Sequence, residues 1–341
     1  MDPLTQGLLG ATIGQAAYGR RLGRSAIVWG ALGGMLPDID VVASAAGPMG
    51  EFLYHRGPTH SLWFGPVSGA LLGYWLWQHG RQRGAPGTRA DWVGLMILAI
   101  FTHPLLDLFT TYGTQLLSPL SNHRFALDAV AIIDPIYTLM LVGAVGVGAW
   151  RGWGAEASRT CAWVALVLST AYLFYALALN DSARNRAEEQ LIADGVRPTE
   201  VSAYPTLLQP WFRRVVARAD QGIHVGWISL WQPRPIEWSA FDSNPDPRVA
   251  RVRQTREGQI FEWFTMGQNA ASIVESADGS VVEIDDLRYG IPATPRQGLW
   301  ALRAELRADG SLVAPPRRIH RELPAPLSVL VQQLLLETFG G

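Results

Sequence analysis

The stretch His103-Pro-Leu-Leu-Asp107 places two ionisable side chains inside an otherwise almost wholly apolar segment, Trp92–Tyr112. A segment of this length crosses the ~30 Å hydrocarbon core of a bilayer as a helix. Residues i and i+4 share one helix face, so His103 and Asp107 are expected to point the same way. Ionisable groups at membrane depth are costly and therefore mark a functional site. The alternative is a core histidine with a hydrogen-bonded partner.

Pro104 directly follows His103 and lies between the two ionisable residues. Proline removes a backbone donor and disfavours helix at the preceding residue, so we expect the helix to kink or restart here. A broken helix at membrane depth is tolerated only where protein covers it or where it lines a wet cavity.

The charged residues are unevenly divided along the chain. All 28 basic residues are arginine, and they nearly balance 29 acidic residues, so the composition gives no nucleic-acid signature. A single cysteine excludes an internal disulfide and a cysteine metal cluster. Residues 1–180 hold 10 Arg and 9 Asp or Glu, whereas residues 181–341 hold 18 and 20. We therefore predict a helical polytopic membrane domain over 1–180, followed by a smaller soluble α+β domain over 181–341.

Apolar length predicts four full spans, at 61–79, 92–112, 126–150 and 160–180, after irregular segments at 4–18 and 25–47. Arginines gather in the loops 80–91 and 151–159, which indicates a cytoplasmic location for these loops. The domain over 181–341 is then expected on the periplasmic or exterior side of the cell inner membrane.

The second half predicts strands at 222–231, 281–289 and 299–306, and helices at 182–193, 249–270 and 327–339. Its aromatic side chains are expected to form a core rather than a membrane-facing belt. These residues are Trp211, Phe212, Trp227, Trp231, Trp238, Trp263 and Phe264.

Acids and histidines of separate segments fall at one depth, near the outer leaflet. Carboxylates gathered there would repel each other and bind protons unless a cation neutralised them. We expect metal ligands at Asp38, Asp40, His60, His103 and Asp107. His55, Asp2 and Asp134 are candidates either to bind the metal directly or to hydrogen-bond to its ligands. Imidazole beside carboxylate favours zinc, with manganese or magnesium as alternatives. Arg56 and Arg124 flank the site and are candidate phosphate contacts, or else snorkelling or carboxylate-paired residues.

An ordered set of motifs resembles one family. The motifs are Met1-Asp-Pro-Leu-Thr-Gln6, Leu36-Pro-Asp-Ile-Asp40, His55-Arg-Gly-Pro-Thr-His-Ser61, His103-Pro-Leu-Leu-Asp107, Thr111-Tyr-Gly-Thr-Gln115 and Asp134-Pro135. Together they resemble the YdjM-like inner-membrane metal-dependent hydrolases, a group also described as LexA-binding, over roughly residues 1–180. The resemblance implies a hydrolase.

Two functions follow from these observations. The first is a membrane-bound metal-dependent hydrolase whose metal-activated water attacks an amphiphilic substrate, a lipid or membrane-proximal phosphoester. The second is a non-enzymatic metal-binding membrane protein, either an ion carrier or a scaffold. Membrane lipid is the expected partner, and no nucleic acid is expected.

Overall fold

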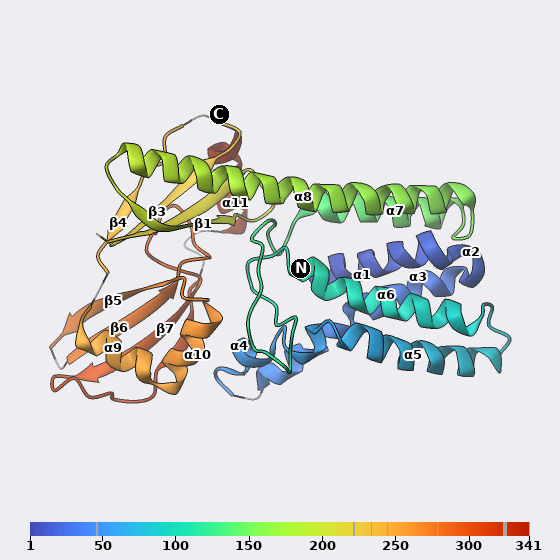
Figure 1. Cartoon of the computed structure of the whole chain (residues 1–341), viewed down its shortest axis with the longest axis horizontal. Coiled ribbons are helices and arrows are strands. Elements are labelled where there is room, and N and C mark those ends of the chain that lie inside the picture. Colours follow the sequence, from blue (N-terminus) through green and yellow to red (C-terminus); the bar gives the residue numbers. More distant parts are fainter. Residues whose placement is uncertain are drawn as a thin grey trace. The chain divides into compact units, whose positions relative to one another are not determined.

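The computed structural model describes residues 1–45, 47–220, 222–232, 234–243, 245–277, 279–322 and 326–340 (Figure 1). It divides the chain into two compact units. The helical unit comprises Met1–Ala43, Tyr54–Leu177 and Leu207–Gln209, and the strand unit comprises Ser44–Leu53, Ala178–Thr206 and Pro210–Gly341. The expected order, a helical region with candidate membrane helices followed by an α+β domain, is confirmed.

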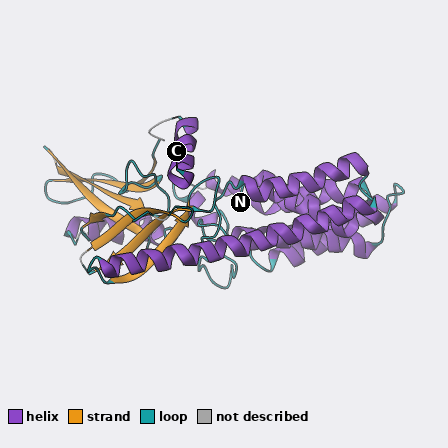
Figure 2. Ribbon diagram, turned by 90° about the horizontal axis from the view of Figure 1, so that it is seen from above, coloured by secondary structure: helices purple, strands orange, loops and turns teal. Residues whose placement is uncertain are grey.

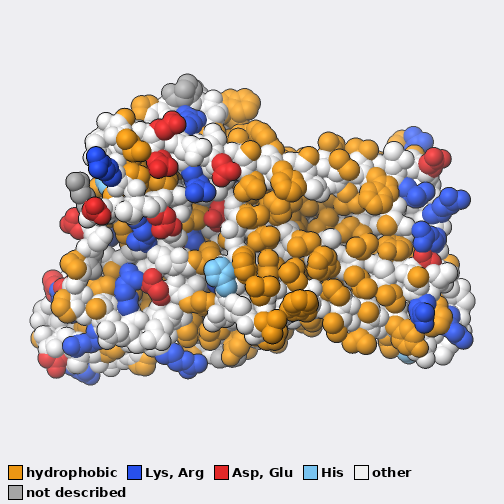
Figure 3. Space-filling model, in the orientation of Figure 1, with side chains coloured by type: hydrophobic (Ala, Val, Ile, Leu, Met, Phe, Trp, Pro, Cys, Tyr) orange, Lys and Arg blue, Asp and Glu red, His pale blue; other side chains and the backbone are white. Residues whose placement is uncertain are grey.

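The helical unit is built from helices that run back and forth past one another (Figures 1 and 2). Their bounds are α1 Pro3–Ile13, η1 Gly14–Tyr18, α2 Gly19–Leu22, α3 Arg24–Met35, η2 Leu36–Ala45, η3 Pro58–His60, α5 Phe64–Arg81, α6 Arg89–Asp107, α7 Pro135–Arg151 and the first part of α8, Glu156–Ala193. Hydrophobic side chains cover the visible face of this unit, and arginines gather at the helix ends farthest from the N-terminus (Figure 3).

Glycines let these helices approach to backbone contact. A Cβ atom added at Gly10 of α1 would lie 2.0 Å from the carbonyl oxygen of Gly30 of α3, and one added at Gly34 would lie 2.4 Å from that of Gln6. Likewise, a Cβ added at Gly69 of α5 would meet the backbone of α6. Small residues at four-residue spacing permit such packing in membranes.

Among the described residues, three helical segments are long and apolar enough to cross a membrane: Arg24–Ala43, Arg89–Asp107 and Glu156–Ala193. The last two contain much of the predicted spans 92–112 and 160–180. The first of these segments covers residues that were expected to be irregular. It is helical throughout because Pro37 lies in the helical continuation η2 and does not end the span. The predicted span 61–79 corresponds to α5, which is helical but less apolar.

One expectation about the helix ends was wrong. The segment 126–150 is helical only from Pro135, because the carboxylate of Asp134 accepts hydrogen bonds from the amides of Ile136 and Tyr137 and so starts α7. Of the two expected outcomes at Pro104, a kink or a restart, the restart does not occur, since α6 continues through Pro104 as far as Asp107. A proline in the last turn removes few helical hydrogen bonds, so the helix tolerates it there.

The strand unit contains two antiparallel sheets, ordered β1-β2-β3-β4 and β5-β6-β7-β8 among the described residues. Their bounds are β1 Pro198–Pro205, β2 Phe212–Ala219, β3 Gly222–Ser229, β4 Ser239–Phe241, β5 Asn269–Ser276, β6 Gly279–Asp286, β7 Trp300–Arg307 and β8 Arg317–His320. The predicted strands at 222–231, 281–289 and 299–306 correspond to β3, β6 and β7. Register pairs such as Val215 with Gly226 and Ile284 with Leu302 place apolar residues in the two cores.

Helices cover both sheets. The end of α8 packs Ala183, Ala187 and Leu191 against the first sheet. The helices α4 Gly50–Tyr54, α9 Pro247–Gln254 and α10 Arg256–Phe264 belong with the second, where Phe52 stacks on Phe264 at 4.0 Å between ring centroids. The single helix predicted at 249–270 was wrong: Thr255 ends α9 and caps α10, and residue 269 already begins β5.

Candidate metal centre

Helix α6 positions the first pair of site residues. Its start is fixed by a capping box between Thr88 and Asp91, and its last turn presents His103 and Asp107 on one face. Both side chains are buried, at 0% and 1% exposure. The prediction that these two side chains lie on one helix face therefore agrees with the structure.

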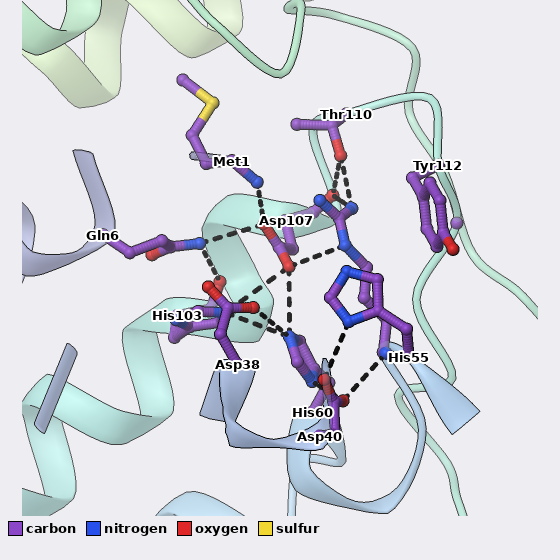
Figure 4. A network of polar contacts seen from close by, with 12 residues as sticks. Met1, Gln6, Asp38, Asp40, His55, His60, His103, Asp107, Thr110 and Tyr112 are labelled. Carbon is purple, nitrogen blue, oxygen red and sulfur yellow. Dashed lines mark hydrogen bonds and ion pairs between the residues drawn. The ribbon is translucent and has the colours of Figure 1, made fainter. Parts of the chain in front are cut away.

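Two segments from the preceding part of the chain meet this face (Figure 4). The 3-10 helix η2 carries Asp38 and Asp40, and the short helix η3 ends with His60. Between them, Arg56 adopts a φ of 60°, a left-handed conformation that non-glycine residues rarely use. Its amide donates to Asp40 at 2.9 Å, so this strained turn is fixed by the site itself.

Four ligand atoms converge on one point. His60 Nε2 lies 3.0 Å from His103 Nε2 and 3.4 Å from Oδ1 of Asp38. Oδ2 of Asp107 lies 3.4 Å from His60 Nε2 and 3.6 Å from His103 Nε2. Around a tetrahedral ion with bonds of about 2.0–2.1 Å, neighbouring donor atoms are about 3.3–3.4 Å apart. The measured separations match this value.

The other ring nitrogens show which protons these histidines carry. His103 Nδ1 lies 2.5 Å from the carbonyl oxygen of Gly34, and His60 Nδ1 lies 3.1 Å from a carboxylate oxygen of Asp40. Oxygens of these two kinds accept, so each Nδ1 donates and each neutral ring keeps its lone pair on Nε2. Two lone pairs and two carboxylate oxygens then face each other, an arrangement that favours a cation between them.

The raised pKa of His60 also indicates that the site stabilises positive charge. Burial alone would lower this pKa, but hydrogen bonds with Asp107, Asp38 and Asp40 outweigh burial and raise the pKa of His60 to about 10. A proton on His60 supplies the positive charge when no other cation does. The donor set and its electrostatics therefore fit a divalent metal ion, which would replace that proton.

Asp40 lies behind the histidines. Its carboxylate accepts from Thr59 Oγ1 at 2.8 Å and from His60 Nδ1, and its other oxygen is 2.8 Å from Nδ1 of His55. These contacts orient two imidazoles at once. Asp38, Asp40 and His55 also form a second, less buried group of candidate ligands that shares Asp38 with the first.

Comparison with known proteins places this site in a family. The model of the YdjM inner membrane protein family matches residues 1–183. The chain belongs to the YdjM inner membrane protein family. It is also 25% identical over 203 residues to the uncharacterized protein YfhP of Bacillus subtilis (strain 168), an alignment covering 57% of this chain and 56% of that protein. The chain thus matches little more than half the length of this relative. No solved structure matches the chain.

All the ligand candidates fall inside the part of the chain that matches the YdjM family. Family membership and the apolar helices make the chain a membrane protein with a buried Asp/His cluster able to hold a metal ion. Two of the predicted site residues act as helix caps and are not members of these two ligand groups. Asp2 accepts from the amide of Thr5 at 3.0 Å, and Asp134 caps α7 and accepts from the hydroxyl of Tyr172 at 2.7 Å.

The two arginines face inward in this YdjM family member. The guanidinium of Arg56 lies 3.0 Å from Asp107 Oδ2 and donates to Thr110 Oγ1 at 2.6 Å. Arg124 donates to the carbonyl oxygen of Gly113 at 2.8 Å. Both are 3% exposed, and both lie about 5 Å from the ring centre of Tyr112. This geometry favours charge balance and loop support over phosphate contact.

Residues that the sequence analysis did not assign also hold Asp107. The Gln6 amide donates to Asp107 Oδ1 at 3.0 Å and to the carbonyl oxygen of His103 at 3.2 Å, and the Met1 α-ammonium pairs with the same carboxylate. Gln6 is the last residue of the motif Met1-Asp-Pro-Leu-Thr-Gln6. Its place in that motif was the available indication that it belongs to the site. The position of Gln6 within α1 gave no indication that its side chain would contact Asp107.

Proposed function

We propose that the chain is a membrane-bound metal-dependent hydrolase acting on a lipid or membrane-proximal phosphoester. The convergence of His60 Nε2, His103 Nε2, Asp38 Oδ1 and Asp107 Oδ2 carries this proposal, because these atoms form a ligand set that favours a bound cation. Zinc suits two imidazoles and two carboxylates best, with manganese next. A bound divalent ion would supply a Lewis acid and a water of lowered pKa.

The chain's own residues divide the remaining tasks. Asp40 orients His60 and His55 through the two sides of its carboxylate. His55 is 21% exposed, whereas His60 and His103 are fully buried, so His55 is the site histidine that solvent and substrate reach. Nδ1 of His55 lies against Asp40, which leaves Nε2 as the ring nitrogen for general acid–base catalysis of hydrolysis.

Asp38 marks the open side of the ligand set. It is 18% exposed, whereas Asp107 is 1% exposed. A head group entering from the interface would therefore approach past Asp38 and His55. The site lies where α6 ends, at the end of the helix away from Arg89. Arg89 starts α6 and Arg81 ends α5, and such arginines favour the cytoplasmic side. This arrangement supports an extracytoplasmic location for the site and for the strand unit.

The ligand geometry also supports a second function, a non-enzymatic metal-binding protein. Four protein donors complete a tetrahedral zinc shell, as in structural zinc sites, whereas catalytic sites keep an open position. The burial of His60, His103 and Asp107 favours this alternative. An activity assay on metal-loaded protein distinguishes the two functions.

The test uses the full chain in lipid nanodiscs, loaded with zinc or manganese. Release of phosphate, of a phosphorylated head group or of fatty acid is measured from phospholipids and from a chromogenic phosphodiester. We expect hydrolysis that His55→Gln abolishes while metal content stays unchanged. His79→Gln is the matched control, because His79 is an exposed histidine on α5. Stoichiometric metal binding without turnover of any of these substrates would favour the scaffold or carrier.

A further inference from the structure

A largely exposed apolar helix lies at the end of the described chain. Helix α11, Leu327–Phe339, reads LSVLVQQLLLETF and carries one charged residue, Glu337. Of its described side chains, residues 328–339, Thr338 alone is buried. Figure 2 shows this helix next to the C mark, outside the strands of its own unit. Apolar helices in soluble units normally bury one face, so this exposure needs an explanation.

The exposed large apolar side chains of α11 and the neighbouring Trp231 are together called the α11 patch. It consists of Trp231, Val329, Leu335, Leu336 and Phe339, which are 60%, 41%, 45%, 48% and 38% exposed. The rings of Trp231 and Phe339 are 5.4 Å apart, and Trp211 lies 5.9 Å and 5.7 Å from them. Phe212 and Phe264 are buried as expected of core residues, but the expectation of a core position was wrong for Trp231.

One hydrogen bond among the described residues ties the helix to the first sheet of its unit. Ser229 Oγ donates to the carbonyl oxygen of Thr338 at 2.8 Å, at the last turn of α11. The outward side chains earlier in the helix are therefore free to bind another apolar surface. Thirteen helical residues span only about 20 Å, which is too short to cross a bilayer.

The chain passes from the helical unit to the strand unit a few residues before Trp211, whose ring contacts the patch. Leu208 belongs to the helical unit, where its amide donates to the carbonyl oxygen of Ile133, beside the start of α7. Trp211 follows three residues later, so it lies within about 11 Å of Leu208 along the chain. A short chain segment thus joins Trp211, the ring neighbour of Trp231 and Phe339, to a residue that hydrogen-bonds beside the start of α7. Outward residues of α7, such as Leu139 at 65% exposure, are apolar.

We propose that the α11 patch binds the surface of the lipid bilayer, with α11 lying in the plane of the interface. Its composition fits this role, because tryptophan and phenylalanine prefer the interfacial region and an apolar helix of this length inserts at the acyl boundary. The near absence of charge points to zwitterionic lipid and to binding that does not depend on salt. This inference is independent of the hydrolase proposal.

The test places spin labels on the full chain in phosphatidylcholine vesicles. In a Cys161→Ser background, cysteines replace Leu336 or Val329 of the patch. Val274→Cys is the matched control, because Val274 is an apolar residue of the same unit and is 59% exposed on β5. Collision rates with oxygen, which concentrates in lipid, and with a nickel chelate, which stays in water, are measured for each label.

We expect labels at 336 and 329 to show a several-fold higher ratio of oxygen to nickel collisions than the label at 274, at both low and high salt. Equal ratios at all three positions would overturn the proposal. So would spin–spin broadening at 336 or 329 that disappears on dilution with unlabelled protein, because a second copy of the chain would then cover the patch. Two patch positions are used so that misfolding of one variant cannot decide the outcome.

Discussion

The two units bury ionised side chains in opposite ways. In the strand unit, Arg288 and Asp286 form a closed pair, with Nε to Oδ1 at 2.9 Å and Nη2 to Oδ2 at 2.7 Å, and both side chains are fully buried. In the helical unit, two imidazoles and two carboxylates turn acceptor atoms toward one point. The first arrangement is complete within the chain. In the second, Arg56 and the Met1 α-ammonium offset the charge of Asp107, but the acceptor atoms that face one another still favour a bound cation. A buried cluster with excess acceptors therefore indicates a ligand, and a matched pair does not.

Removing an imidazole should give the largest effect. We expect His103→Ala to lose the bound metal, because one donor and its hydrogen bond to Gly34 disappear together. Metal content per folded chain is measured by atomic emission, and unchanged hydrogen exchange in β6 shows that the strand unit is intact. His79→Ala should keep the wild-type content. Wild-type metal content in His103→Ala would make the site assignment wrong.

Breaking the closed pair should leave the metal in place and destabilise the other unit. Arg288→Met leaves Asp286 buried without its partner, which costs about 3–5 kcal/mol. Hydrogen exchange of the amides in β6 and β7 should accelerate accordingly. The double variant Arg288→Met with Asp286→Leu should recover most of the protection. If the single variant exchanged as slowly as the wild type, the pair would not stabilise this unit.

Changing the carboxylate behind the histidines should have an intermediate effect. Asp40→Asn keeps the shape but weakens its hold on the ring N–H groups of His60 and His55, and we expect metal affinity to fall about 10–100-fold. Competition with a chromophoric chelator measures this change. Asp181→Asn, at a carboxylate that is 63% exposed, is the control. Complete loss of metal would instead show that Asp40 is a ligand, as the sequence analysis expected.

A change of pH should alter metal affinity more gradually than any of these substitutions. The free site holds a proton on His60 below a pKa of about 10, and an ion must displace this proton to bind. Metal affinity should therefore rise with pH, by about tenfold for each unit between pH 6 and 8. The same chelator competition measures the slope. An affinity independent of pH would show that binding releases no proton.

The sequence predicted local chemistry better than it predicted segment ends. The i, i+4 spacing placed His103 and Asp107 on one face because helix periodicity is a local property. The end of α6 at Asp107 and the start of α7 at Pro135 depend instead on caps and on backbone contacts across the fold. Apolar content alone extended both helices into the loop between them.

The site shows the same division between local and long-range information. Residue type and neighbouring prolines pointed to several aspartates as metal ligands. Asp2 and Asp134 instead cap helices, because aspartate is also a preferred residue at a helix N-cap. Gln6 could not be assigned, since its contact with Asp107 joins residues 101 positions apart. The exposure of Trp231 was also missed, because aromatic content is the same in a core and in an interfacial belt.

The backbone contact between α1 and α3 has a consequence for protein engineering. The carbonyl oxygen of Gly34 accepts from His103, and a methyl group added at Gly34 would lie 2.4 Å from the carbonyl oxygen of Gln6, whose side chain holds Asp107. A single added carbon would thus displace supports of two ligands at once. A designer who redesigns these helices for expression or stability must treat Gly34 as part of the metal site, although its own side chain is a hydrogen atom.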